Sequence, residues 1–143
     1  MQLNPGIIKG ESFTDERGTI RYANDFYMQE IKRMYVIEHP DSSVIRAWQG
    51  HRKEQKWFFV VEGGFEIHLV LPDNWSNPSQ NLPVISYNLF AENNEVLHIP
   101  GGYANGIRAL KDNSKLLVYS DFDIKTAAED NYKFDKNFWY KWA

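Results

Sequence analysis

The feature that most constrains the fold is a series of short apolar segments with a period of two. This alternation is typical of β-strands, and the breaks between segments contain Gly, Pro, Asn and Asp. The segments recur about every ten residues, which favours an all-β sandwich or barrel. The predicted strands are Thr19–Tyr22, Lys32–Glu38, Val44–Trp48, Gln55–Glu62, Phe65–Leu71, Val84–Phe90, Glu95–Ile99, Ala104–Leu110 and Lys115–Asp121.

The connections between these strands carry their own signals. Gly63-Gly64 lies between two strong segments, and a two-residue glycine turn predicts a tight hairpin there. Residues 72–83 are rich in turn formers and predict a long surface loop. Residues 125–143 predict a short helical or irregular segment that ends in an aromatic tail. Because that tail is too apolar to stay in water, we expect it to pack on the barrel or on a second subunit.

Length and charge exclude several classes of function. A chain of 143 residues suits one domain, here residues 1–143 with a barrel over about 10–122. A net charge of -3 gives no broad basic field, so we expect no nucleic-acid partner. The chain has no cysteine, no signal-peptide pattern at its start and no apolar run long enough to span a bilayer. We therefore expect a cytoplasmic protein without a membrane partner.

Four motifs follow one another along the chain: Asp15–Gly18 (DERG), Ile31–Tyr35 (IKRMY), Arg46–Lys53 (RAWQGHRK) and Ile99–Gly106 (IPGGYANG). In order and spacing they resemble motifs of the RmlC-like and WxcM-like cupins. These are the dTDP-4-dehydrorhamnose 3,5-epimerases and the related dTDP-4-keto-6-deoxyglucose 3,4-ketoisomerases. The resemblance covers roughly residues 10–122. It implies a double-stranded β-helix, or jelly roll, and leaves the aromatic tail unexplained.

The resemblance also implies a reaction. Those enzymes are isomerases that remove a proton α to the ketone of a nucleotide-linked 4-keto-6-deoxy sugar and pass through an enolate. The reaction needs a base, a group that stabilises the enolate and a hold on the diphosphate. Guanidinium groups bind phosphate oxygens bidentately and stay charged at any working pH. Arg17, Arg46 and Arg52 are therefore the predicted diphosphate ligands, with a solvent-exposed arginine as the alternative.

The base is where this chain departs from the pattern. The family places a histidine at the position of Gln49, and an amide cannot accept the proton near neutral pH. Gln49 is left to bind a hydroxyl or carbonyl group. His51 would project from the same strand face as Gln49, and the ketoisomerases also carry a histidine there. His51 is therefore the predicted base.

The remaining roles are also implied by the resemblance. Lys56 matches a lysine that steadies the enolate, and Tyr119 is the candidate for the family's tyrosine acid. Tyr103 replaces a phenylalanine of the fourth motif and Asn105 its histidine, and we group both with the substrate-binding residues. The alternatives are a solvent-facing lysine at position 56 and tyrosines that only fill the barrel.

Many cupins bind a metal ion, so we compare this chain with their ligand pattern. Their sites combine two histidines one residue apart, an acid and a third histidine, whereas this chain has Gln49, His51, Gln55 or Lys56, and Asn105 at those positions. We therefore predict no metal and no other cofactor.

Three hypotheses follow. The first is an epimerase or ketoisomerase of nucleotide sugars, and the second is a sugar-nucleotide-binding cupin that has lost its base. The third is an unrelated small-molecule cupin whose motifs serve only the fold. The resemblance and the aromatic tail further predict a homodimer.

Overall fold

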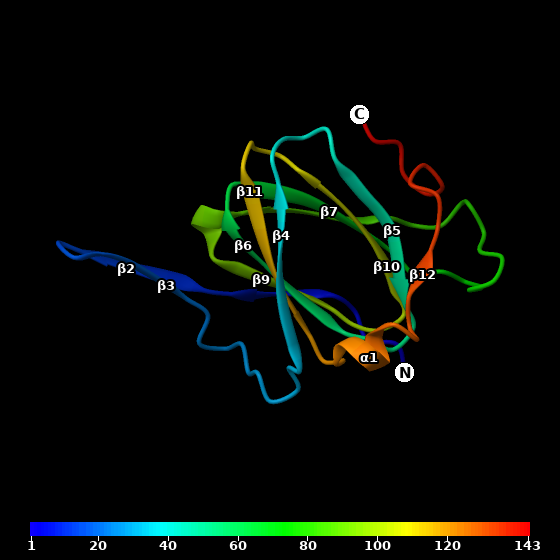
Figure 1. Ribbon diagram of the computed structural model, residues 1–143, viewed down its shortest axis with the longest axis horizontal. Coiled ribbons are helices and arrows are strands. Elements are labelled where there is room, and N and C mark those ends of the chain that lie inside the picture. The colour runs from blue at the N-terminus through cyan, green and yellow to red at the C-terminus, as the bar shows by residue number, and fades with distance from the viewer.

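Two antiparallel five-stranded sheets face each other in the computed structural model, which describes residues 1–143 (Figure 1). The first sheet has the order β1 (Gly6–Lys9), β9 (Glu95–Ile99), β6 (Lys56–Glu62), β11 (Ser114–Ser120) and β4 (Arg33–His39). The second has the order β12 (Tyr132–Lys133), β5 (Ile45–His51), β10 (Tyr103–Ala109), β7 (Gly64–Val70) and β8 (Ile85–Phe90). A separate hairpin contains β2 (Glu11–Asp15) and β3 (Gly18–Tyr22), and two short helices, η1 (Ala91–Asn93) and α1 (Ile124–Ala127), complete the fold.

The apolar alternation of the sequence becomes the core between the sheets. Along β11, Leu116 and Val118 are fully buried, whereas Leu117 and Tyr119 point to the outer face and are half-buried. Phe58 and Val60 of β6 join the same cluster from the neighbouring strand. The prediction of an all-β fold is confirmed. None of the helices has the length and apolar character needed to cross a membrane.

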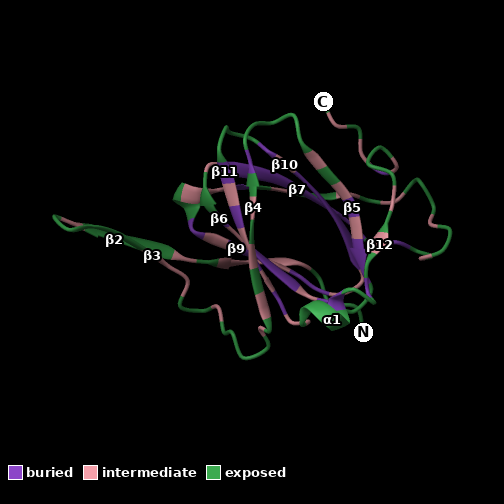
Figure 2. Ribbon diagram, in the orientation of Figure 1, coloured by how far each residue is buried: buried purple, intermediate pink, exposed green.

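The outer face of the second sheet is covered as well, and β7 is buried along its whole length (Figure 2). The aromatic tail supplies this cover. Trp139 packs edge-on against Trp48 of β5, with 5.4 Å between ring centroids, and its indole Nε1 donates a hydrogen bond of 2.8 Å to the Ser79 carbonyl. The predicted loop at 72–83 thereby meets the tail. Of the two alternatives for the tail, packing on the barrel is the one found.

The predicted hairpin at Gly63-Gly64 is wrong. β6 pairs with β9 and β11, while β7 pairs with β8 and β10, so this turn carries the chain from one sheet to the other. Gly63 has a φ of 75°, which a glycine adopts without cost, and an added Cβ would lie 2.2 Å from the Ser114 hydroxyl. The glycine signal marks a corner of the sandwich.

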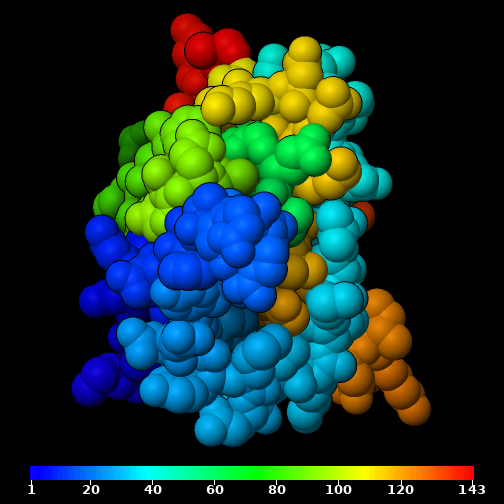
Figure 3. Space-filling model, turned by 90° about the vertical axis from the view of Figure 1, so that its left-hand side faces the viewer, coloured from blue at the N-terminus to red at the C-terminus, as the bar shows by residue number.

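Each predicted strand is present: Glu95–Ile99 has the predicted bounds, and most ends of the other strands differ by one residue. The largest change is in β5, which was predicted to end at Trp48 and runs on to His51. β1, β2 and β12 were not predicted. β2 and β3 form an arm that projects from the body and faces the viewer in Figure 3.

We expect the aromatic tail to contribute strongly to stability. Trp139 is only 8% exposed, and truncating a buried tryptophan costs about 3–5 kcal/mol. Trp139→Ala should lower the free energy of unfolding by that amount in urea denaturation. Tyr27→Ala is the control, because Tyr27 is 69% exposed and exposed positions usually change stability by less than about 0.5 kcal/mol. Equal stability of Trp139→Ala and the unmodified protein would contradict the packing role.

Candidate active site

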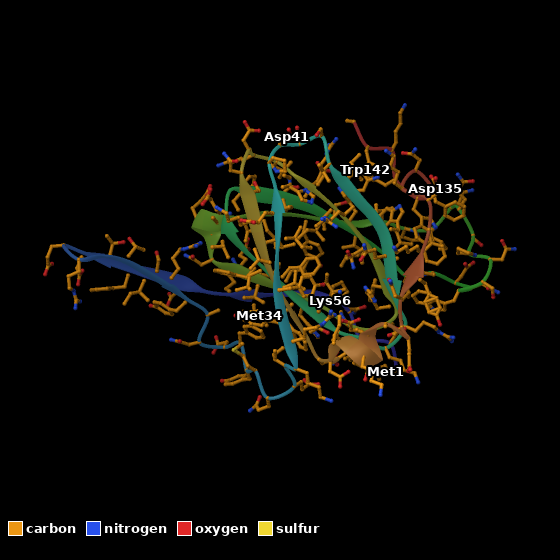
Figure 4. All side chains as sticks on the ribbon, in the orientation of Figure 1. Met1, Met34, Asp41, Lys56, Asp135 and Trp142 are labelled. Carbon is orange, nitrogen blue, oxygen red and sulfur yellow. The ribbon has the colours of Figure 1, made fainter.

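Two adjoining cavities open between β4, the edge strand of the first sheet, and β5 of the second. Their volumes are about 260 and 320 Å³, and they share Tyr35, Gln49 and Lys56 as lining residues. Figure 4 shows Lys56 in the space between the two sheets. The site therefore lies on the inner side of the barrel.

The first cavity combines two cations, a carboxylate, two amides and an apolar wall. A register shift between β5 and β10 pairs Gln49 with Asn105 and Arg46 with Ile107, and all four residues line the cavity. Such a β-bulge re-aims a side chain, which is why Arg46 shares a cavity with a residue three positions away on the strand. The Arg46 Nε donates a hydrogen bond of 3.1 Å to His39 Nε2. This cavity holds polar groups for binding, and the predicted base His51 does not line it.

The second cavity contains the predicted base. His51 and Glu54 line it together with Arg33 of β4, and residues of α1 form its far wall. The shared residues Gln49 and Lys56 connect it to the first cavity. The prediction that Gln49 and His51 face the same side is confirmed. The wall made by α1 lies outside the part of the chain covered by the motif resemblance.

The surroundings of His51 fix its protonation state. Its Nδ1 lies 2.8 Å from the Asp130 carbonyl oxygen, which can only accept, so Nδ1 carries the hydrogen and Nε2 has a free lone pair. Burial and then the Lys56 charge lower the pKa of His51, against opposing effects of Asp130 and Glu54. The ring is therefore neutral at pH 7. Nε2 has no hydrogen-bond partner, and the residue is 6% exposed.

Glu54 was not identified from the sequence, although its side chain is fully buried here. Its Oε2 accepts hydrogen bonds of 2.9 Å from Arg33 Nη2 and 2.5 Å from Ser120 Oγ, and lies 3.7 Å from Lys56 Nζ. Its Oε1 lies 3.4 Å from His51 Nδ1. In the sequence Glu54 stands in a charged run typical of solvent-exposed turns, so no local signal distinguishes it.

Lys56 and Tyr35 form the second reactive pair. Lys56 is 6% exposed, and its Nζ donates a hydrogen bond of 2.7 Å to the Tyr35 hydroxyl oxygen. The hydroxyl hydrogen of Tyr35 is thereby left to donate elsewhere. The alternative of a solvent-facing Lys56 is wrong.

Tyr119 does not belong to the site. On β11 the residue opposite Lys56 is Ser120, whereas Tyr119 is opposite Trp57 and lies on the outer face of the sheet. There it packs against Phe26, with ring centroids 5.4 Å apart. Its assignment as the acid is a wrong prediction, because strand parity turns it away from the barrel. Tyr35 is the tyrosine that faces the cavity.

Three further predicted residues also lie away from the two cavities. Arg17 is on the turn of the projecting hairpin, 78% exposed, and pairs with Asp15 at 2.6 Å. Arg52 lies on the surface and lines a separate cavity with Tyr132. Tyr103 is 4% exposed and belongs to the apolar core. None of the three meets the Lys56 site.

The side chains of the site can also be examined as metal ligands. No group of three or more His, Asp or Glu side chains is arranged to hold a metal ion.

Solved structures with the same fold are enzymes of nucleotide-sugar chemistry. The TDP-quinovose 3,4-ketoisomerase from Campylobacter jejuni is 18% identical with a TM-score of 0.70, over 92% of this chain and 93% of that one. The dTDP-4-dehydrorhamnose 3,5-epimerase from Bacillus anthracis is 18% identical with a TM-score of 0.76, over 94% and 80%. A 3,4-ketoisomerase from Thermoanaerobacterium thermosaccharolyticum, solved as a double mutant with TDP, is 21% identical with a TM-score of 0.67, over 94% and 90%.

These likenesses define the class of fold. The chain has the jelly-roll fold of the RmlC-like epimerases and 3,4-ketoisomerases, as the motifs predicted. No protein-family model matches the sequence. No curated protein matches it either.

We expect the Lys56 charge to have a measurable effect on the pKa of His51. Because Lys56 lowers the pKa of His51, Lys56→Met should raise that pKa toward its ordinary value. NMR titration of the imidazole signals would measure the change in the ligand-free protein. Lys53→Met is the control, since Lys53 is exposed on the same turn. An unchanged or lower pKa in Lys56→Met would contradict the described geometry.

Proposed function

We propose that the protein is an epimerase or ketoisomerase of a nucleotide-linked 4-keto-6-deoxy sugar, with dTDP as the nucleotide. The observation that carries the proposal is the neutral His51, whose Nε2 lacks a partner, in the same cavity as the Lys56–Tyr35 pair. A base together with a cation and a hydroxyl donor is the set of groups that enolisation of a ketone requires. The likeness in fold to enzymes with this activity supports the same conclusion.

The chemistry divides between these groups. His51 Nε2 takes the proton from the carbon next to the ketone, and the electrons of that C–H bond become the enolate. The Tyr35 hydroxyl donates to the enolate oxygen, while the Lys56 ammonium group stabilises its negative charge. Return of the proton to the opposite face of the same carbon gives an epimer. To move the ketone, the proton goes instead to the former carbonyl carbon, and the hydroxyl proton of the neighbouring carbon passes to the former carbonyl oxygen, so that the C=O bond forms at the neighbouring carbon.

Binding of the substrate falls to the first cavity. The Arg46 guanidinium suits the diphosphate, because it is exposed where the cavity opens and keeps its charge. Gln49 and Asn105 stand opposite each other on β5 and β10, and their amides suit sugar hydroxyls. In this proposal, substrate binding lies on one side of Lys56 and proton transfer on the other.

A non-catalytic sugar-nucleotide-binding cupin is the second candidate. Two observations favour it: Gln49 stands where the related enzymes have a histidine, and His51 Nε2 is closed off from solvent. In that case the Arg46 cavity would bind the nucleotide sugar without any proton transfer.

Exchange of substrate protons with deuterated water separates the two candidates. With dTDP-4-keto-6-deoxyglucose, we expect proton NMR to show deuterium uptake next to the ketone, at C3, C5 or both. His51→Ala should slow this uptake by about 10²-fold or more, the usual contribution of a general base. Tyr35→Phe should also slow it, whereas Tyr119→Phe on the outer face should not. Nucleotide signals that broaden without any exchange would establish the binding protein instead.

We also propose that the protein is a homodimer joined through the β2–β3 hairpin. Phe13 and Ile20 are cross-strand partners on this arm and are 55% and 62% exposed. A two-stranded hairpin is marginally stable alone in water, so a second copy that covers this apolar pair would stabilise it. The arm also carries Arg17 away from its own barrel, and Arg17 could then reach a substrate only in the partner subunit.

Analytical ultracentrifugation tests this assembly. We expect a dimer for the unmodified chain and a monomer for Phe13→Asp, because a carboxylate would be buried without a partner in the interface. Leu3→Asp is the control, since Leu3 is equally exposed at 55% but lies outside the hairpin. A dimer that persists in Phe13→Asp would place the interface elsewhere.

A further inference from the structure

We propose that Glu54 is a positioning residue whose buried carboxylate allows His51 to accept a proton beside the Lys56 cation. The inference rests on the proposed enolisation and adds to it a residue that does not touch the substrate. Glu54 is 2% exposed, and its Oε1 has no hydrogen-bond partner. A buried carboxylate oxygen without such a partner is costly and therefore calls for an explanation.

The contacts of Glu54 come from several elements. Arg33 reaches it from β4 at 2.9 Å and Ser120 from β11 at 2.5 Å, while Lys56 at the start of β6 lies 3.7 Å away. The Oε1 without a partner is 3.4 Å from His51 Nδ1. One carboxylate therefore lies among the Arg33 and Lys56 cations and the imidazole that becomes a third cation when it accepts a proton.

The charge count shows what Glu54 changes. With His51 neutral, Arg33 and Lys56 supply two positive charges and Glu54 one negative charge, so the cluster has one excess positive charge. Proton transfer to His51 raises this excess to two. If Glu54 were uncharged, the same step would raise it from two to three, and repulsion between buried cations is strong because little water screens it. Glu54 thus lowers the cost of forming the imidazolium.

Asp130 is the other acid near His51, but its carboxylate is already engaged elsewhere. The Asp130 carboxylate accepts hydrogen bonds of 2.8 Å from the backbone N–H groups of residues 52, 53 and 54. Asp130 therefore anchors the turn, and its carbonyl orients the His51 ring. The hydroxyl of Tyr35 faces Lys56 from β4. Among these groups, Glu54 is the carboxylate with an oxygen left to face the imidazole.

The expected pH effect has a definite sign. Burial and Lys56 lower the pKa of His51, and the Glu54 charge acts in the opposite direction. Glu54→Gln keeps the shape of the side chain and removes its charge, so the pKa of His51 should fall further. The base form then persists to lower pH, and the acid limb of the kcat/KM profile for proton exchange moves to lower pH. The plateau rate should fall about tenfold, because a weaker base takes the proton less readily.

The test compares Glu54→Gln with two other variants. Glu54→Asp keeps the charge and should retain the acid limb, while Glu129→Gln removes an exposed carboxylate and should leave both rate and limb unchanged. If Glu54→Gln exchanges as fast as the unmodified enzyme with the same acid limb, the inference is overturned. A slower rate with an unmoved limb would also overturn it, since that result indicates only a structural role.

A titration without substrate separates this inference from the proposed function. NMR of the ligand-free protein should show a lower pKa of His51 in Glu54→Gln and a higher one in Arg33→Met, because that variant removes a cation that Glu54 now neutralises. The Arg33→Met result still decides the matter if Glu54→Gln does not fold. Shifts of these signs without any proton exchange in the unmodified protein would reject the proposed function and leave the charge coupling standing. Absent or reversed shifts would reject the coupling itself.

Discussion

The structure depends on two sheets that bury apolar inner faces against each other. Along β4 and β5, however, polar side chains take some of the inward positions. Elsewhere the inward positions carry side chains such as Leu116 and Ile67, and the interior is closed. Along β4 and β5 the inward positions instead include Tyr35, Gln49 and His51. Because buried polar groups need partners, Tyr35 and His51 are linked through Lys56 and Glu54 in a network beside the cavities. The apolar core stabilises the barrel, and the site forms where polar side chains interrupt that core.

Much of this arrangement could be predicted from local pattern. The period of two identified the main strands and placed Gln49 and His51 on one face. This pattern could not show whether Tyr35 or Tyr119 faces Lys56, because both fit the alternation of their own strands. Only the pairing of β11 with β6 shows that Tyr119 does not face Lys56. Glu54 was missed for a related reason. Its burial depends on Arg33 and other distant partners that no local pattern contains.

The C-terminal segment contributes more to the site than its sequence suggested. The aromatic tail covers the outer face of the second sheet through Trp139, and α1 forms a wall of the second cavity. Between them, Asp130 orients His51 with its carbonyl and holds the preceding turn with its carboxylate. The motifs that resemble nucleotide-sugar enzymes end before this segment. The barrel thus provides His51, and the segment outside the resemblance sets its tautomer.

The measurement that tests the central claim most directly is a crystal structure of His51→Asn with dTDP-4-keto-6-deoxyglucose, since this variant should hold the substrate without converting it. We expect the diphosphate on Arg46 and the sugar ring in the cavity beside Lys56. The carbon next to the ketone should lie about 3–3.5 Å from the side chain at position 51, the separation of reacting atoms in a near-attack arrangement. A nucleotide bound outside the β4–β5 opening, or a sugar directed away from position 51, would contradict the assignment of this cavity as the active site.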